Sequence, residues 1–431
     1  MITSPHKPHP LRPAGSLLLL LPIFFLLVCL PATGQLVINE IVANNKNTID
    51  DVDGESSDWI EILNTGPQIN LGGYSLTDDP AVPGKWVFPG GQFLGSNSYL
   101  IVFASGKDRA ALRQQLHTNF SLDSDGEYLA LCDPSGNVID EFAPSFPSVK
   151  RDIGYGIGND GTLGYLYPAT PGRANGDPLT GFVADTVFSH QRGFYDEPIE
   201  VTISSATPEA IIRYTTSGRE PTRNFGQIYT GPVAIDSTTV LRAIAYRPDM
   251  VPTNVDAKSY LYPEDIVEQS EMNSAVVNST TYRGEIRSAL TQLPVVSVSF
   301  NPTVLFGAGG IHNNPTLSGS TSEREAHFEF FDPSNAEDST HEPAGIRIHG
   351  GNARRHPKKP FRLYFRGEYG DNRLRYPLFE GSPVESFDQL VLRGGGHDSW
   401  SLAATFGRDQ QEDLPPHGTL MRCLLYTSDA P

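Results

Sequence analysis

Short runs in which apolar and polar residues alternate recur along most of the chain, and they predict β-strands separated by tight turns. Over residues 36–146 the runs are LVINEIV, DWIEILN, INLGGYSL, WVFPG, SYLIVFA, EYLALCD and NVIDEF, with glycine, asparagine or aspartate between them. Alternation with a period of two places successive side chains on opposite faces of a sheet. Seven strands within roughly 110 residues fit an immunoglobulin-like sandwich. One segment here, KDRAALRQQL at 107–116, predicts a helix instead.

Residues 181–262 predict a second β unit, because the alternation is strong in PIEVTISS, AIIRYTTSG, PVAIDSTTVLRAIAYR and KSYLY. The intervening SGREPT contains Gly218 and Pro221, and both residue types favour turns. Residues 263–292 are polar and rich in serine, asparagine and glutamate. They predict a linker with one amphipathic turn near RGEIRSALTQL.

A third stretch of predicted strands begins with LPVVSVSF at 293–300 and contains a densely basic segment, GGNARRHPKKPFRLYFRGEYG at 350–370. Strand alternation places one set of side chains toward the core: Phe361, Leu363 and Phe365. It places a polar set on the opposite face: Arg362, Tyr364 and Arg366. The positive charges therefore form a stripe on one face of a strand.

Three interpretations of this stripe are open. The first is a solvated strand face whose basic residues also discourage edge-to-edge pairing. The second is a nucleic-acid site, which the formal net charge of -18 and the lack of base-stacking motifs disfavour. The third is a phosphate site, since kinases hold ATP phosphates with a strand lysine beneath a glycine-rich loop. LFGAGGIHNNP at 305–315 is a glycine-bearing loop of this kind.

The N-terminus predicts a secretory signal peptide over residues 1–34. A basic segment with Lys7 and Arg12 precedes the apolar run LLLLLPIFFLLVCL, and the small residues of PATG precede Gln35. Fourteen apolar residues are too few to span a bilayer comfortably, so we expect cleavage before Gln35 and no transmembrane segment afterwards. Cleavage would make the net charge about -20. We expect a secreted or cell-surface protein.

Cysteine usage and motifs exclude several kinds of site. The chain has three cysteines, of which Cys132 lies in an apolar strand and is predicted to be an inert core thiol. No disulfide framework is indicated. The sequence has no GxxxxGK[ST], GxSxG, HExxH or CxxC motif, so a P-loop, a serine-hydrolase elbow and a zinc site lack support.

The first β region resembles the lamin-tail domain of secreted bacterial proteins. The resemblance rests on INEIVANN, DGESSDWIEILNTG, LGGYSLTDDP, FSLDSDGEYLALCDPSGNVIDEF and an exit segment ending in TPGRAN, so the domain is expected over residues 35–175. The acidic loop IDDVDGESSDW does not fit an EF-hand, because Ile49 and Ile60 would occupy its first and last ligand positions. A looser cation site at Asp51, Asp53 and Asp58 and a simple turn both stay open.

The second β region resembles the small C-terminal sandwich of chitobiase and β-hexosaminidase, through IRYTTSGREPT, IYTGPVAI and TTVLRAIAY. The domain is expected over residues 181–262. Ser217 stands where that family usually has aspartate. The resemblance implies a non-catalytic spacer or accessory module. Tyr214, Tyr229 and Tyr246 are either sugar-stacking residues or ordinary strand aromatics.

Residues 293–400 resemble the N-terminal part of a CotH-type kinase domain, a family of atypical kinases named for a spore-coat protein. The incomplete domain is expected over residues 293–422. The motifs are LPVVSVSF, LFGAGGIHNNP, EREAHFEFFDP, GIRIHGGNARRHPKKPFRLYFRGEYG, LRYPLF and FDQLVLRGGGHDSW. The resemblance implies that ATP phosphates contact the strand lysine, at Lys358 or Lys359, with Arg362 adding charge. An acid that orients the lysine is expected among Glu323, Glu325 and Glu329.

The catalytic and metal-binding acids of that family would lie beyond HDSW, and Asp398 and Asp409 do not fit their motif. We therefore assign no catalytic and no metal-binding residue. The ending MRCLLYTSDAP continues no part of the domain, so residues 423–431 are expected to be non-native and the chain to be a fragment. As it stands, the chain is expected to be inactive.

The sequence thus predicts a mainly β chain, with two immunoglobulin-like β-sandwiches followed by the N-terminal part of an α+β atypical kinase-like domain. The first functional hypothesis is an extracellular protein kinase that, at full length, uses ATP and a divalent metal to phosphorylate serine or threonine of an extracellular protein substrate. The alternative is a non-enzymatic adhesion or scaffold protein that binds surface glycans or proteins. Neither involves nucleic acid.

Overall fold

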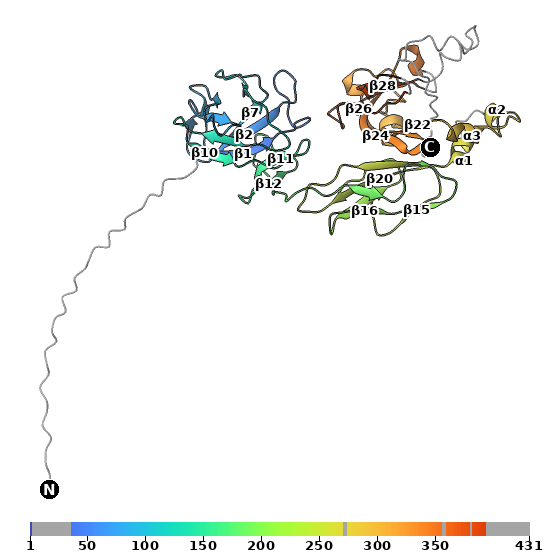
Figure 1. Ribbon diagram of the computed structural model, residues 1–431, viewed down its shortest axis with the longest axis horizontal. Helices are drawn as coiled ribbons and strands as arrows, with labels where there is room; N and C mark the ends of the chain where they lie inside the picture. The colour runs from blue at the N-terminus through green and yellow to red at the C-terminus, as the bar shows by residue number, and fades with distance from the viewer. Residues whose placement is uncertain (2–35, 270–273, 334, 356–358, 380–381, 394–431) are drawn as a thin grey trace.

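A computed structural model describes residue 1 and residues 36–393, apart from 270–273, 334, 356–358 and 380–381 (Figure 1). Outside these residues lie Lys358, Asp398, Asp409, the segment 423–431 and the predicted signal peptide except for its first residue. Three parts follow one another along the chain: a first module (36–179), a second module (183–262) and a third region (293–393). Among the described residues, no helix has both the length and the apolar character needed to cross a membrane.

The first module is a β-sandwich whose two sheets enclose one apolar core. The larger sheet has the order β12-β11-β1-β2-β7-β8, and the smaller has β10-β9-β4-β5. The larger sheet comprises β1 (Leu36–Val42), β2 (Asp58–Asn64), β7 (Ser98–Ala104), β8 (Leu116–His117), β11 (Gly154–Ile157) and β12 (Leu163–Leu166). The smaller comprises β4 (Ser75–Thr77), β5 (Trp86–Val87), β9 (Leu129–Cys132) and β10 (Val138–Phe142), and β3 (Ile69–Asn70) pairs with β6 (Phe93–Leu94).

Alternation in the sequence accounts for this core, because the inward residues of both sheets are fully buried, including Ile60, Ile62, Leu76 and Leu131. Cys132 is also fully buried, which confirms its prediction as a core thiol. The helix predicted over 107–116 is wrong. Asp108 and Arg113 have φ of 52° and 66°, which an α-helix cannot contain, and Arg109 bridges to His117.

The second module is a smaller β-sandwich (Figure 1). Its main sheet has the order β14-β21-β20-β17-β18. The strands are β14 (Gly193–Phe194), β17 (Ile211–Thr215), β18 (Gln227–Ile228), β20 (Thr239–Tyr246) and β21 (Asp256–Leu261). Two pairs face it across the core: β13 (Thr186–Phe188) with β16 (Ile203–Ser205), and β15 (Ile199–Val201) with β19 (Val233–Ile235).

The predicted linker contains short helices: α1 (Pro263–Glu268), α2 (Ser274–Val277) and α3 (Ile286–Thr291). Arg287 on α3 forms ion pairs with Glu264 on α1, at 3.0 Å, and with Asp196 of the second module. The segment is therefore packed against the second module at its start.

The third region is built on an antiparallel sheet with the order β22-β23-β24-β25-β28. The strands are β22 (Val295–Ser299), β23 (Arg324–Asp332), β24 (Asn335–Ile348), β25 (Phe361–Tyr364) and β28 (Gln389–Leu392). Helix α4 (Pro302–Phe306), the hairpin of β26 (Leu374–Arg375) with β27 (Ser386–Phe387), and 3-10 turns at 320–322 and 352–355 complete it. Phe361, Leu363 and Phe365 are buried in its core, as the alternation predicts.

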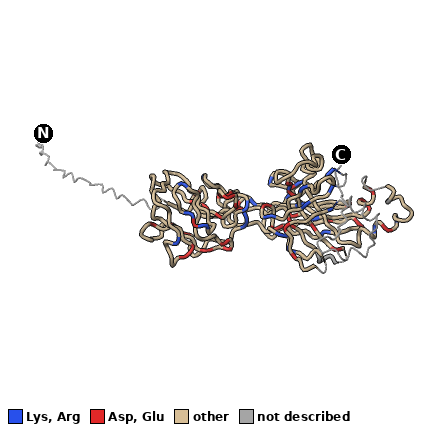
Figure 2. Tube along the Cα trace, turned by 90° about the horizontal axis from the view of Figure 1, so that it is seen from above, with Lys and Arg blue, Asp and Glu red and all other residues tan. Residues whose placement is uncertain are grey.

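The opposite face of this sheet is partly covered by the second module, which lies beneath it in Figure 1. Acidic and basic residues are interspersed over all three parts of the chain (Figure 2). The charge pattern alone therefore does not mark one site.

Candidate functional site: the polar face of the third sheet

The basic stripe predicted on β25 belongs to a continuous polar face that runs across the whole sheet. Residues directly opposite one another on neighbouring strands share a face. Arg347 of β24 lies opposite Arg362 of β25, Gly345 lies opposite Tyr364, and Tyr364 lies opposite Gln389 of β28. Glu325 of β23 lies opposite Gly345 and extends the face toward the second module.

One half of this face is neutralised around Glu323. Its nearly buried carboxylate accepts a hydrogen bond of 2.5 Å from Arg347 Nε and lies 3.4 Å from Arg366 Nε. The ring of Tyr364 lies between the two guanidinium groups, 4.5 Å from that of Arg347 and 4.7 Å from that of Arg366. These two arginines are therefore fixed by a carboxylate and an aromatic ring.

The other half, at the end of β24 and the start of β25, is a group of basic side chains that we call the basic cluster: His349, Arg354, Lys359 and Arg362. Arg362 contacts Gln389 Oε1 at 3.4 Å, and Arg354 donates to the Leu317 carbonyl. The Nε atoms of both arginines are buried and have no hydrogen-bond acceptor among the described residues.

The electrostatics of the basic cluster are one-sided. Burial lowers the pKa of His349, and the positive charges of Arg362 and Arg354 lower it further. Burial also lowers the pKa of Lys359. Arg354 and Arg362 can only donate hydrogen bonds, and such donors suit a multiply charged anion such as a phosphate chain.

The structure places the predicted nucleotide contacts unequally. Arg362 and Lys359 are half-buried and lie in the basic cluster, whereas Lys358 is outside the described residues. His349 and Arg354 add to the cluster. Both residues belong to the run GIRIHGGNARR, which precedes the lysines in the sequence. The density of basic residues there could have indicated them as further members of the site.

The three acids predicted to orient a lysine have other surroundings. Glu323 holds Arg347 and Arg366, as above. Glu329 is fully buried against the second module, where it forms an ion pair of 2.8 Å with Arg192 and accepts hydrogen bonds from Ser259. Glu325 lines a pocket between the second module and the third region.

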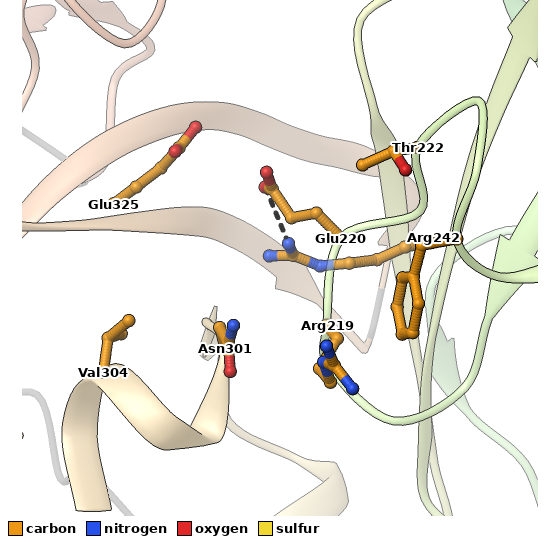
Figure 3. A pocket seen from close by; sticks show the side chains of 8 residues that line it. Arg219, Glu220, Thr222, Arg242, Asn301, Val304 and Glu325 are labelled. Carbon is orange, nitrogen blue, oxygen red and sulfur yellow. Dashed lines mark hydrogen bonds and ion pairs between the residues drawn. The ribbon is translucent and has the colours of Figure 1, made fainter. Parts of the chain in front are cut away.

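That pocket has a volume of about 400 Å³ and is shown in Figure 3. Arg242 of β20 crosses it, with 3 % of its side chain exposed, and forms an ion pair of 2.9 Å with Glu220. Its other terminal nitrogen lies 3.4 Å from the Ser299 carbonyl of the third region. The pocket is therefore part of the contact between the two parts, and Arg242 joins them.

The glycine-bearing loop 307–314 is folded on itself. Asn314 donates to the carbonyls of Ala308 and Gly310, and Asn313 donates to that of Phe306. A side chain at Gly310 would meet the Leu305 carbonyl at 2.3 Å, so glycine is required there. The loop conformation is thus set by its own asparagines.

The acidic loop of the first module forms a different cluster from the one predicted. Asp51, Asp53 and Glu55 come together, whereas Asp58 turns away and accepts a hydrogen bond from the Asn45 amide at 3.0 Å. The ammonium group of Lys107 lies among the three carboxylates, at 2.5, 2.7 and 2.8 Å. Burial alone would raise the pKa of Asp51, but Lys107 and the loop amides hold it at about 2. A side chain of the protein therefore occupies the place of a cation.

Replacing Lys107 with alanine is expected to destabilise the first module by about 2 kcal/mol, the scale of hydrogen bonds to charged groups. Three carboxylates would then lie together without their cation. We expect added calcium to raise the melting temperature of the variant and a chelator to leave that of the unaltered protein unchanged. Differential scanning calorimetry measures both. A chelator-sensitive unaltered protein would contradict this assignment of Lys107.

The strand tyrosines of the second module interact with one another and with their neighbours. The rings of Tyr214 and Tyr229 meet edge to face at 6.4 Å, and Tyr246 accepts a hydrogen bond from Arg213. Both Tyr214 and Tyr229 pack against the module core. These are the contacts of ordinary strand aromatics.

Comparison with known proteins identifies the two modules. A family model described as the Lamin Tail Domain matches residues 30–145, and one described as the Chitobiase/beta-hexosaminidase C-terminal domain matches residues 190–257. No curated protein matches the chain. The predictions of these two domains and of a mainly β, immunoglobulin-like fold are confirmed. Neither match extends into residues 293–422, where the resemblance to CotH-type kinases stays a prediction.

Proposed function

We propose that the full-length protein is an extracellular CotH-type protein kinase. Its lamin-tail-like and chitobiase-like modules would present a sheet that binds phosphate. The basic cluster would hold the phosphates of ATP, and the phospho-acceptor would be a serine or threonine of an extracellular protein. Export is proposed from the predicted signal peptide. The kinase assignment is proposed from the resemblance of residues 293–400.

The observation that carries the proposal is a contrast between two halves of one sheet face. Arg347 and Arg366 share the carboxylate of Glu323. Arg354 and Arg362 each leave a buried Nε–H without an acceptor among the described residues. Buried donors of this kind are costly unless a partner binds them, and a phosphate chain supplies several oxygen acceptors at once.

The residues present fit a phosphate chain better than they fit a metal. The described charges that perturb His349 are positive, and Glu323 is committed to two arginines. Bound ATP would supply the transferred phosphoryl group. In this chain, Gln389 orients Arg362 and the Leu317 carbonyl orients Arg354. No described carboxylate is assigned to a metal.

Replacing Arg362 with alanine is expected to weaken binding of inorganic tripolyphosphate by about 10- to 100-fold, because a charge-assisted hydrogen bond in a partly buried site is lost. The matched control is Arg375→Ala, since that side chain is 72 % exposed and pairs only weakly with Asp371 among the described residues. Isothermal titration calorimetry measures both affinities. Binding should strengthen as the pH falls and His349 gains a proton.

Equal affinity of the unaltered protein and Arg362→Ala would contradict phosphate binding at the basic cluster. That outcome would favour the second candidate, a non-enzymatic surface scaffold for glycans or proteins. The observation that favours the scaffold is the docking of the third sheet on the second module, through Glu329 with Arg192 and through Arg242 with Ser299. Such docking presents several β modules as one unit.

A further inference from the structure

An arginine of the first module reaches into the turn that follows the basic strand. Arg151 Nη1 donates to the carbonyls of Gly367 and Gly370, at 2.9 and 3.0 Å, and Nη2 donates to that of Tyr369 at 2.9 Å. One guanidinium group thus donates to three carbonyls of the same turn. Arginine suits this role because its donors are held in a rigid planar fork.

A second loop of the first module also contacts this turn of the third region. Asn47 Nδ2 donates to the Glu368 carbonyl at 3.0 Å. Asp152, next to Arg151, accepts hydrogen bonds from the backbone amides of Lys46 and Asn47, at 2.7 and 2.8 Å. Hydrogen bonds therefore join the two loops of the first module that contact the turn.

The turn itself is fixed to the polar face of the sheet. The amides of Tyr369 and Gly370 both donate to the Arg366 carbonyl, at 2.9 and 3.1 Å. Burial and the negative charge of the nearby Glu323 carboxylate raise the pKa of Tyr369. The side chains of Glu323 and Tyr369 lie close together over Gly345. A Cβ at this glycine would lie 2.3 Å from Glu323 Oε1 and 2.6 Å from the Tyr369 ring.

A chain of contacts therefore links the first module to the basic strand. Arg151 holds the turn, Tyr369 in the turn lies beside Glu323 over Gly345, and Glu323 holds Arg347 and Arg366. Arg347 lies directly opposite Arg362 in the sheet register. If Glu323 were released, its two arginines would lose the partner that keeps them apart from the basic cluster.

We infer that the lamin-tail-like module acts as a positioning clamp for the phosphate-binding strand, with Arg151 as the positioning residue and Tyr369 as its link to Glu323. This inference rests on the proposed function for its effect on phosphate binding. Its structural half does not depend on it. The first module would then tune the basic cluster rather than serve only as a spacer.

The test combines hydrogen exchange with tripolyphosphate titration on the whole protein and its Arg151→Ala variant. Arg283→Ala is the matched control, because that arginine is exposed and lies in the segment between the second module and the third region. Arg151→Ala is expected to speed exchange of the Tyr369 and Gly370 amides by at least tenfold and to weaken tripolyphosphate binding several-fold. Arg283→Ala should change neither.

A second variant separates the clamp from the link. Tyr369→Phe removes the hydroxyl of the ring that lies beside Glu323 and leaves the carbonyls for Arg151, so it should weaken binding while exchange of the turn stays slow. Unchanged exchange in Arg151→Ala would overturn the clamp. Faster exchange with unchanged affinity would overturn its effect on the basic cluster. If the unaltered protein binds no tripolyphosphate, the proposed function fails, and the exchange result still decides whether the clamp exists.

Discussion

Replacing Arg192 with alanine is expected to lower the free energy of unfolding of the joined second module and third region by about 3–5 kcal/mol, the cost of breaking a buried ion pair from one side. Arg192 lies in the second module, and its side chain is 7 % exposed. Its partner Glu329 lies on β23 and is fully buried. The variant would leave this carboxylate in the interface with hydrogen bonds from Ser259 alone.

The surroundings of Glu329 explain why the loss should be large. Burial raises its pKa, and Arg192 is the first of the charges that oppose this rise. Ser259 also contacts Ser297 at 2.8 Å, and Phe194 meets Phe331 edge to face. These contacts close the interface to water on several sides, so an unpaired carboxylate cannot be solvated without separating the two parts.

Urea titration followed by circular dichroism measures the loss, with Arg247→Ala as the control. Arg247 is a more exposed arginine of the same module, and its pair with Asp249 should contribute less than about 1 kcal/mol. Adding Glu329→Gln to Arg192→Ala should restore part of the stability, because it removes the unpaired charge. A midpoint equal to that of the control would show that the interface does not depend on this pair.

The stability of the first module is expected to fall as the pH rises from about 5 to 8, by up to about 3 kcal/mol in total. The cause is Glu40 on β1, whose carboxyl is fully buried beneath the exit segment of the module. Thr170 donates to it from its amide, at 3.0 Å, and from its hydroxyl, at 2.8 Å. Burial nevertheless raises the pKa of Glu40 from 4.5 to about 7, with Glu61 adding negative charge and Arg173 opposing it.

Stability falls with rising pH because the folded module binds more protons than the unfolded chain. Between pH 4.5 and about 7, the folded module keeps the Glu40 proton and the unfolded chain has lost it. Folding is therefore favoured by protons in this window, and raising the pH weakens it. Glu61 lies close by, and burial raises its pKa as well, although Asn39 and the Gly172 amide donate to it.

Fluorescence of Trp59 and Trp86, both buried in this module, follows its unfolding in urea at each pH. Glu40→Gln keeps an acceptor for Thr170 and cannot ionise, so its stability should vary much less above about pH 6. Below that pH, Asp58, whose pKa burial raises to about 6, still contributes. Glu200→Gln, at an exposed position of the second module, is the control and should leave the slope unchanged. A steep slope retained above about pH 6 in Glu40→Gln would assign the pH dependence to another group.

Strand positions in both modules could be predicted because each strand has one face in an apolar core. The seven runs predicted in the first module coincide with strands of the sandwich: β1, β2, β4, β5, β7, β9 and β10. Short strands such as β8 and β11 were not predicted, because hydrogen bonds to distant strands define them rather than local alternation. KDRAALRQQL has a composition that favours a helix. However, Lys107 pairs with the acidic loop, and Asp108 and Arg113 adopt the left-handed backbone conformation.

The site was predictable only in part. Alternation correctly separated Phe361 and Leu363 from Arg362 on β25. It could not show that Glu329 faces a second module, since that depends on how two sheets pack. Nor could it show that Arg151, more than 200 residues earlier in the sequence, holds the turn after the basic strand. Pairing between distant segments decides which charges are neutralised and which stay available.

The most direct test of the phosphate-binding face is a titration of the protein with inorganic tripolyphosphate, followed by NMR of the arginine side-chain Nε–Hε groups. We predict that the signals of Arg354 and Arg362 shift with saturation, because their Nε–H groups lack an acceptor among the described residues. Those of Arg347 and Arg366 should stay in place, because Glu323 already binds them. Shifts confined to Arg347 and Arg366, or no saturable shift at any of the four, would contradict the account.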